Sequence, residues 1–268
     1  MPKGCFIHSQ TILIMKKAIL YTLLLLLVSC GKRTIEEINT DVSEQQKYFP
    51  LTIGQSIDYQ IDSISIVTLA GAGIIRDSST TFIRETITDT LRDTEGNLQW
   101  KVERFERTSD TLPWKIGRIW TAEITDQKAV RTEENLRFLR LVFPMTKRSE
   151  WNGNLWIDPN RTIKVADQSI RPFTNWNYEV DSIDIPRQVG AFSFDSVLVV
   201  TEVDDENVIE KRLSRTIYAK NIGLVYKEQW ILDSQYCNAN PVPSDCETKP
   251  WVEKAEKGYV IRQTVLRY

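Results

Sequence analysis

The 268-residue sequence has no apolar run long enough to cross a membrane as a helix. Its longest such run, Ala18–Val28, has 11 residues, whereas a membrane-spanning helix needs about 20. Acidic residues are also missing before Glu36, while Lys16 and Lys17 directly precede the run. A basic start, a short apolar stretch and small residues after it are typical of a secretory signal peptide. A buried core helix is the alternative, although such helices are rarely leucine-rich on every face.

The apolar run ends at a cysteine in a recognisable pattern. Leu27-Val28-Ser29-Cys30 resembles the lipobox of bacterial lipoproteins, in which an apolar residue and small residues precede the lipidated cysteine. The resemblance implies that residues 1–29 are removed and that diacylglycerol is attached to the thiol of Cys30, often with acylation of the new amino group. Two or more chains give a stable membrane anchor, whereas one chain binds only marginally. A cleaved signal peptide with a chance cysteine is the alternative.

Residues 1–14 precede a signal peptide that is complete from Met15 onward. We expect translation to begin at Met15, or the extension to be removed with the signal. Either event removes the only histidine, His8. A mature chain without histidine excludes Ser-His-Asp and Cys-His catalysis and histidine zinc sites. The sequence therefore predicts a protein that is not an enzyme and has no cofactor and no metal.

Two other motifs are candidates for chemistry. Gly71-Ala72-Gly73 is followed by Arg76, where a dinucleotide-binding loop has a third small residue, so we interpret it as a bend between strands. The adjacent acidic pairs Glu133-Glu134 and Asp204-Asp205 could serve glycoside hydrolysis, which uses two carboxylates. Both pairs fall in predicted hairpin tips, where we expect them to face water.

Few cysteines remain in the mature chain. Once Cys30 is lipidated, Cys237 and Cys246 are left, and a secreted protein lies in a compartment that permits disulfides. The segment between them is rich in Asn, Pro and Ser. We predict a disulfide that closes this loop and stabilises the fold by about 2.5–3 kcal/mol. A two-cysteine metal site is the alternative, but it lacks two further soft ligands.

The mature chain is mildly acidic. Removal of Lys3, Lys16 and Lys17 leaves 31 basic and 36 acidic side chains, a formal charge of −5. A nucleic-acid partner calls for a basic surface, so we expect no nucleic-acid binding.

Apolar residues alternate with polar ones from Tyr48 onward, as strands require. Examples are Ile57, Tyr59 and Ile61, after which the apolar parity switches near Asp62-Ser63, which suggests a bulge. Turn-forming segments separate the runs, and Asn152-Gly153 is the strongest hairpin signal. No long amphipathic helix is expected. The predicted fold is all-β and mainly antiparallel, a curved meander sheet of barrel-like or sandwich architecture with little helix.

The predicted organisation has three parts. They are a signal peptide over residues 1–29, a lipidated tether over residues 30–47 and one β-rich domain over residues 48–268. The segments that begin at Tyr48 (YFPLT) and Val142 (VFPMT) are alike, so two similar halves near 48–141 and 142–268 are an alternative. The first of these segments and the YAKNIGLVYKEQW stretch from Tyr218 resemble β-rich envelope lipoproteins of Gram-negative bacteria, a group to which no activity is attached.

Three tryptophans are the candidates for a ligand or partner face. Trp151, Trp156 and Trp176 lie in polar, Asn-rich segments, where a ring could stack on a sugar or a partner protein; ordinary packing is the alternative. The best interpretation is a lipid-anchored structural or binding protein of the cell envelope, whose partner is a protein, lipid or glycan. A carrier of an apolar ligand in a β half-barrel and a carbohydrate-binding module are the alternatives. The lipobox resemblance implies the outer membrane, because Gly31 replaces the Asp that retains lipoproteins in the inner membrane, and the periplasmic face is favoured over the cell surface.

Overall fold

The computed structural model describes residues 41–165 and 168–268. The α-helices within these ranges are α2 (Val42–Gln46) and α3 (Trp251–Lys254), and a 3-10 turn covers Tyr236–Asn238. No helix in these ranges is long and apolar enough to cross a membrane. The strands of the first half are β1 (Ser56–Leu69), β2 (Gly73–Arg92), β3 (Leu98–Arg107), β4 (Lys115–Ile124), β5 (Lys128–Glu133) and β6 (Leu136–Val142). The later strands are β7 (Glu150–Trp151), β8 (Ile163–Val165), β9 (Gln168–Ile170), β10 (Tyr178–Val189), β11 (Phe192–Glu206), β12 (Glu210–Ala219), β13 (Gly223–Asp233) and β14 (Lys257–Arg267).

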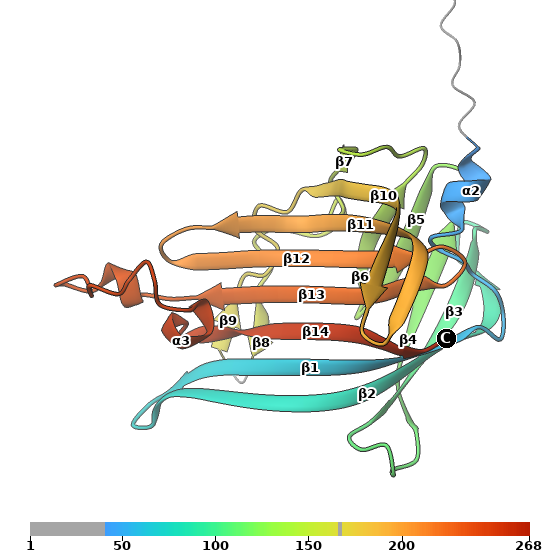
Figure 1. Ribbon diagram of the computed structural model, residues 1–268. Coiled ribbons are helices and arrows are strands. Elements are labelled where there is room, and N and C mark those ends of the chain that lie inside the picture. Colours follow the sequence, from blue (N-terminus) through green and yellow to red (C-terminus); the bar gives the residue numbers. More distant parts are fainter. Residues whose placement is uncertain (1–40, 166–167) are drawn as a thin grey trace, which may run out of the picture. The chain divides into compact units, whose positions relative to one another are not determined.

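Twelve strands form one antiparallel sheet, which confirms the predicted all-β class with little helix. The strand order is β6-β5-β4-β3-β2-β1-β14-β13-β12-β11-β10-β7. Nearly every neighbour in space is a neighbour in sequence, as in a meander. The exceptions are the pairing of β1 with β14, which joins the first and last strands in the middle of the sheet (Figure 1), and the pairing of β10 with β7 at one end of it.

The two ends of the sheet approach each other, so the sheet is barrel-shaped and nearly closed. The backbone N–H of Leu139 on β6 donates to the carbonyl of Gly153, just after β7, at 2.8 Å. In the other direction, Nε1 of Trp151 donates to the carbonyl of Leu139 at 2.9 Å. These two bonds join the edge strand β6 to the segment at β7 and partly cover that edge.

The hairpin predicted at Asn152-Gly153 is wrong. β7 ends at Trp151, and the following residues leave the sheet as turns. The glycine serves close packing instead, because a Cβ at Gly153 would lie 2.3 Å from the ring of Tyr178. Glycine is thus needed at position 153 for its close contact with the ring of Tyr178, and not for a two-residue hairpin turn.

The largest apolar cluster fills the curled part of the sheet. It joins side chains from both halves of the chain, among them Phe49, Val102, Leu141, Leu198 and Tyr218. Burial of these groups supplies the main driving force for curling, at about 25 cal/mol per Å² of apolar surface.

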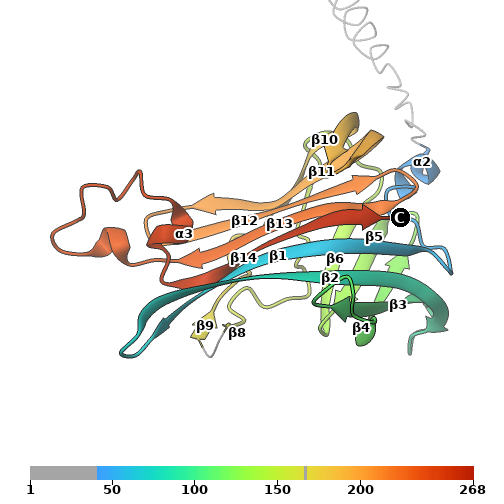
Figure 2. The ribbon, with the colours of Figure 1, turned by 60° about the horizontal axis from the view of Figure 1, so that its bottom comes forward.

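The parity switch in β1 has a different cause from the predicted bulge. β1 pairs with β2 and β14 without interruption at Asp62-Ser63, and the one register shift lies at Asp58/Tyr59. Instead, both faces of the strand are covered: Tyr59 is buried against the inside of the sheet, whereas Ile66 packs with Trp251 of α3 on the opposite face. Figure 2 shows α3 and the β8–β9 hairpin on opposite sides of the long strands.

The first described residues, 41–48, pack against the sheet. Asp41 caps α2 by accepting from the backbone N–H of Ser43 at 3.0 Å. The Gln45 amide pairs with the backbone of Met145, donating to its carbonyl and accepting from its N–H. Tyr48 is 1% exposed, and its hydroxyl lies 2.7 Å from a carboxylate oxygen of Asp184. Residues 41–268 accordingly form one compact unit.

Candidate functional site

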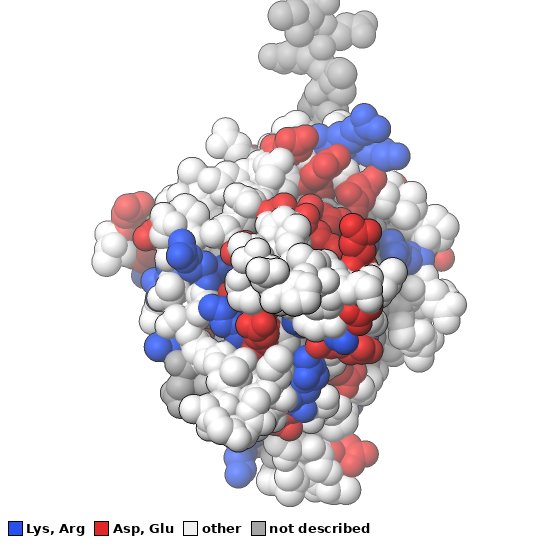
Figure 3. Space-filling view, turned by 90° about the vertical axis from the view of Figure 1, so that its left-hand side faces the viewer, with Lys and Arg blue, Asp and Glu red and all other residues white. Residues whose placement is uncertain are grey.

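Cys30 lies outside the described residues, as do Cys5 and His8, so lipidation stays a prediction. Cys237 and Cys246 are joined by the predicted disulfide. It closes a loop that projects from the end of the long strands (Figure 1). Figure 3 faces that end, where acidic side chains gather on one side and basic side chains are scattered.

The structure does not bring the three candidate tryptophans together as one open face. Trp151 is buried, and Trp176 is half-buried with Nε1 donating to the carbonyl of Pro172 at 2.7 Å. Both rings pack on Tyr178, at centroid distances of 5.6 and 6.0 Å. Trp156 is 43% exposed, and the guanidinium of Arg137 covers it at 4.5 Å from the ring centroid. Of the three, Trp156 is thus the ring with a large exposed surface.

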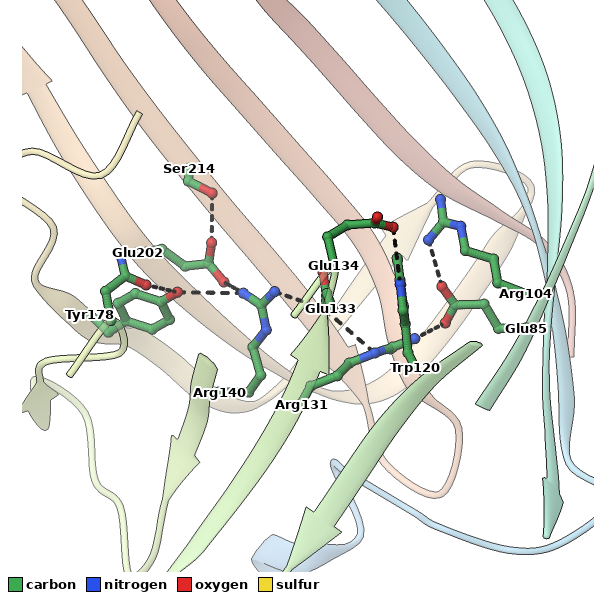
Figure 4. A network of polar contacts seen from close by, with 11 residues as sticks. Glu85, Arg104, Trp120, Arg131, Glu133, Glu134, Arg140, Tyr178, Glu202 and Ser214 are labelled. Atoms are coloured by element: carbon green, nitrogen blue, oxygen red, sulfur yellow. Dashed lines mark hydrogen bonds and ion pairs between the residues drawn. The ribbon is translucent and has the colours of Figure 1, made fainter. Parts of the chain in front are cut away.

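The most unusual feature is a chain of charged side chains inside the curled sheet (Figure 4). Arg140 of β6 lies near one end of the chain, between two carboxylates, and is buried. It forms an ion pair of 3.0 Å with Glu202 of β11 and one of 2.8 Å with Glu133 of β5. Glu202 is completely buried and accepts a further bond from the hydroxyl of Ser214 at 2.6 Å.

The chain continues toward β2 and β3. Glu133 lies 3.5 Å from Nε of Arg131. Arg131 in turn pairs with Glu85 at 2.5 Å, and Glu85 pairs with Arg104 at 2.9 Å. The three carboxylates and three guanidiniums therefore alternate and balance in charge. Each carboxylate is shared by arginines or held by a hydroxyl, as burial of a charge requires.

Aromatic rings frame this chain. The ring of Trp120 lies between two guanidiniums, with Arg104 at 4.4 Å and Arg131 at 4.9 Å from its centroid. At the other end, the hydroxyl of Tyr178 accepts from Arg140 at 3.4 Å. The cation–π contacts with Trp120 and the hydrogen bond to Tyr178 help to hold the guanidiniums in place.

The network shifts the titration of its members. Burial raises the pKa of Glu133, but the charges of Arg140, Lys227 and Arg131 lower it more, so the net pKa lies well below its usual range. Burial raises the pKa of Tyr218 to about 12, so that hydroxyl stays neutral. Burial, together with the charge of Arg140, lowers the pKa of Lys227 on β13. Lys227 is thus a cation placed beside other cations.

Two hollows adjoin the network. A cleft of about 150 Å³ is lined by Arg104, Trp120, Lys227, Gln229 and Gln263, among others. A second hollow of about 80 Å³ lies toward Phe49 and Tyr218. Glu85, Arg131, Glu133 and Lys227 line both hollows and so form the layer between them.

Sequence reasoning missed this network. The expectation that Glu133 faces water is wrong, because β5 turns it inward to Arg140, while the exposed Glu134 pairs with Arg118 outside. Asp204-Asp205 lies within β11 and not at a hairpin tip. The usable signal was the apolar run Val197–Val200 just before Glu202, which is typical of a strand buried on both faces. A buried charge needs a partner, so an ion pair of Glu202 could have been expected from the sequence, but not the residues that supply it.

Metal binding finds no support in the described ranges, where no three His, Cys, Asp or Glu side chains are grouped as a metal site.

No protein-family model and no curated protein matches the chain. Two solved structures are similar to it. One is a protein provisionally assigned as exported, with a YmcC-like fold, from Bacteroides fragilis NCTC 9343; it is 11% identical, with 82% of this chain and 97% of that chain covered and a TM-score of 0.36. The other is provisionally assigned as a lipoprotein of Parabacteroides distasonis ATCC 8503; it is 10% identical, with 81% and 96% covered and a TM-score of 0.32. TM-scores below 0.5 do not identify a family for this chain.

Proposed function

We propose that this chain is a lipid-anchored protein of the bacterial cell envelope that acts by binding and not by catalysis. The observation that carries the proposal is the pattern from Lys16 to Cys30, where charge, apolar length, small residues and cysteine all agree. The described unit begins at Asp41, so residues 31–40 connect it to the anchor.

The interior supports a non-catalytic role. A general base must accept a proton near the working pH, whereas the arginines hold Glu133 ionised with a pKa far below neutrality. Glu85 and Glu202 are likewise paired with arginines. These carboxylates are suited to fixing the shape of the sheet and to presenting a charged lining.

The size of the interior argues against the carrier alternative. Pockets for drug-sized ligands have volumes of about 300–1,000 Å³, whereas the hollow beside Phe49 and Tyr218 has about 80 Å³. An acyl chain would have to displace side chains of the main apolar cluster. The carbohydrate-binding alternative depends on Trp156, the exposed ring among the three tryptophans.

Metabolic labelling with an alkyne analogue of palmitate tests the anchor. The full-length chain should take up label, and Cys30→Ala should not. Ser29→Ala is the matched control, because it keeps a small residue before the cysteine and should be labelled. Label on Cys30→Ala, or none on the wild type, would overturn the proposed anchor.

Location and binding need separate measurements. Density separation of the two membranes should place the wild type in the outer membrane and Cys30→Ala in the soluble periplasmic fraction. Protease added to intact cells should leave the protein uncut if it faces the periplasm. Crosslinking in intact cells should recover a specific envelope component; recovery of none would contradict the binding role.

A further inference from the structure

Beside the charged network, one cation has no ion-pair partner in the part of the chain that the structure describes. Six charged side chains of the network alternate and cancel: Glu202, Arg140, Glu133, Arg131, Glu85 and Arg104. Lys227 is a seventh charge, and it lies in the field of Arg140, Glu133 and Glu202. No carboxylate among the described residues comes within the 4.0 Å that defines an ion pair with it. A half-buried ammonium without an ion-pair partner destabilises a protein, so its presence calls for an explanation by function.

Two further donors beside Lys227 lack an acceptor. Nε of Arg104 and Nε2 of Gln263 are buried and have no hydrogen-bond partner in the protein. Both residues line the same cleft as Lys227. They come from different strands: Arg104 from β3, Lys227 from β13 and Gln263 from β14. The register places Lys227 directly opposite Gln263 across the β13–β14 pairing.

A surplus positive charge and unsatisfied donors on one cleft select an acceptor that carries negative charge. Water in the cleft would not offset the charge. The cleft is small, at about 150 Å³, so it has room for a charged group and not for an entire large ligand. The remainder of such a ligand would extend beyond the cleft.

We propose that the cleft between β3 and β13–β14 binds the anionic group of a ligand, a carboxylate or a phosphate, with Lys227 as the charged partner and Arg104 and Gln263 as hydrogen-bond donors. The acidic sugars and the phosphate-bearing glycolipids of an envelope share this chemistry. The inference deepens the proposed binding role but does not depend on the lipid anchor. Its failure would leave the labelling of Cys30 unchanged, and loss of labelling would leave the cleft intact.

Calorimetric titration of the purified full-length chain tests the site with three probes: glucuronate, inorganic phosphate and glucose. At least one of the two anions should bind, and glucose, the neutral analogue of glucuronate, should not. Binding of glucuronate alone would identify a sugar acid, and binding of phosphate alone a phosphate group. Equal binding of glucose and glucuronate, or binding of none of the three, would overturn the proposal.

Substitutions then locate the binding. Lys227→Met keeps most of the apolar stem and should weaken anion binding about tenfold or more, because a charged hydrogen bond is lost. Lys147→Met, at an exposed position, is the matched control and should bind as the wild type does. Gln263→Leu removes a donor at similar volume and should weaken binding several-fold, which keeps the test valid if Lys227→Met folds poorly by circular dichroism. Unchanged affinity in both cleft variants would overturn the proposal.

Discussion

Arg140 and Glu202 form an ion pair of 3.0 Å across the inside of the sheet, although β6 and β11 lie near opposite ends of the strand order. Backbone hydrogen bonds hold neighbouring strands, but this pair joins strands that are not neighbours. It acts together with the seam at Leu139 and Gly153. The curl of the sheet is therefore fixed by side-chain charges as well as by apolar packing.

Loss of one partner of this pair should be costly. Arg140→Met leaves the fully buried Glu202 without its guanidinium, and we expect the free energy of unfolding to fall by about 3–5 kcal/mol. The double variant Arg140→Met/Glu202→Leu removes both charges and should recover most of that loss. Urea denaturation of the four proteins of this cycle measures the coupling. A double variant as unstable as the sum of the single variants would show that the pair does not act as a unit.

Ionisation of Glu133 should make the free energy of unfolding depend on pH in the acid range. Its pKa is lowered in the folded state, so the folded form holds its proton less tightly than the unfolded chain does. The resulting stability is present above the ordinary pKa of about 4.3 and is lost as the pH falls below it toward the folded value. We expect the free energy of unfolding to decline from about pH 5 downward. Glu133→Gln should be less stable at neutral pH and show a flatter decline; parallel curves for the two proteins would contradict this assignment.

The sequence was sufficient for the fold class and not for the site. Alternation of apolar and polar residues in strands such as Leu98–Arg107 depends on local geometry, so it can be recognised without knowing the neighbours. The same local signal failed in β1, because Ile66 is buried by α3, which comes almost two hundred residues later. The alternation of apolar residues along a strand indicates that one face of the strand is buried, but it does not indicate which segment buries it.

The charged network could not be assembled from sequence for a similar reason. Arg140 meets Glu202 only because the sheet curls, and curvature arises from register shifts such as those at Val180/Ser182 in β10. No residue pattern specified those shifts. The disulfide could be predicted because two cysteines nine positions apart leave a single pairing once Cys30 is assigned elsewhere.

The disulfide should stabilise the folded β domain only modestly against unfolding. Cys237 and Cys246 close a short loop at the end of the sheet, for which the chain-entropy model gives about 2.5–3 kcal/mol. Cys237→Ser/Cys246→Ser should therefore unfold at lower urea concentration and keep its β-type circular dichroism spectrum. Non-reducing mass mapping of the wild type should recover the linked peptides, and two free thiols there would contradict the bridge.

Gly153 should tolerate no side chain. A Cβ would lie 2.3 Å from the ring of Tyr178, which is fully buried and cannot retreat. We expect Gly153→Ala to reduce the free energy of unfolding by about 3 kcal/mol, at the upper end for overpacking. Gly117→Ala is the matched control, because its Cβ would meet the movable side chain of Glu106 at 3.1 Å. Equal stability of the two variants would show that the ring of Tyr178 does not require the glycine.

The stability of a Lys227 variant distinguishes a structural role of this ammonium from a binding role. If its ammonium served the fold, removing it would destabilise the protein. Its pKa is instead lowered by burial and by Arg140, so the folded state binds this proton less tightly than the unfolded chain does. The charged form of Lys227 therefore lowers the free energy of unfolding at pH values below its folded pKa. This loss disappears as the pH rises toward the unfolded pKa of about 10.4.

Lys227→Met should accordingly raise the free energy of unfolding at pH 7 by about 1 kcal/mol, while Lys147→Met changes it little. Addition of the bound anion should narrow the difference, because the ligand stabilises the wild type and not the variant. A Lys227→Met protein less stable than the wild type would assign the ammonium to the fold.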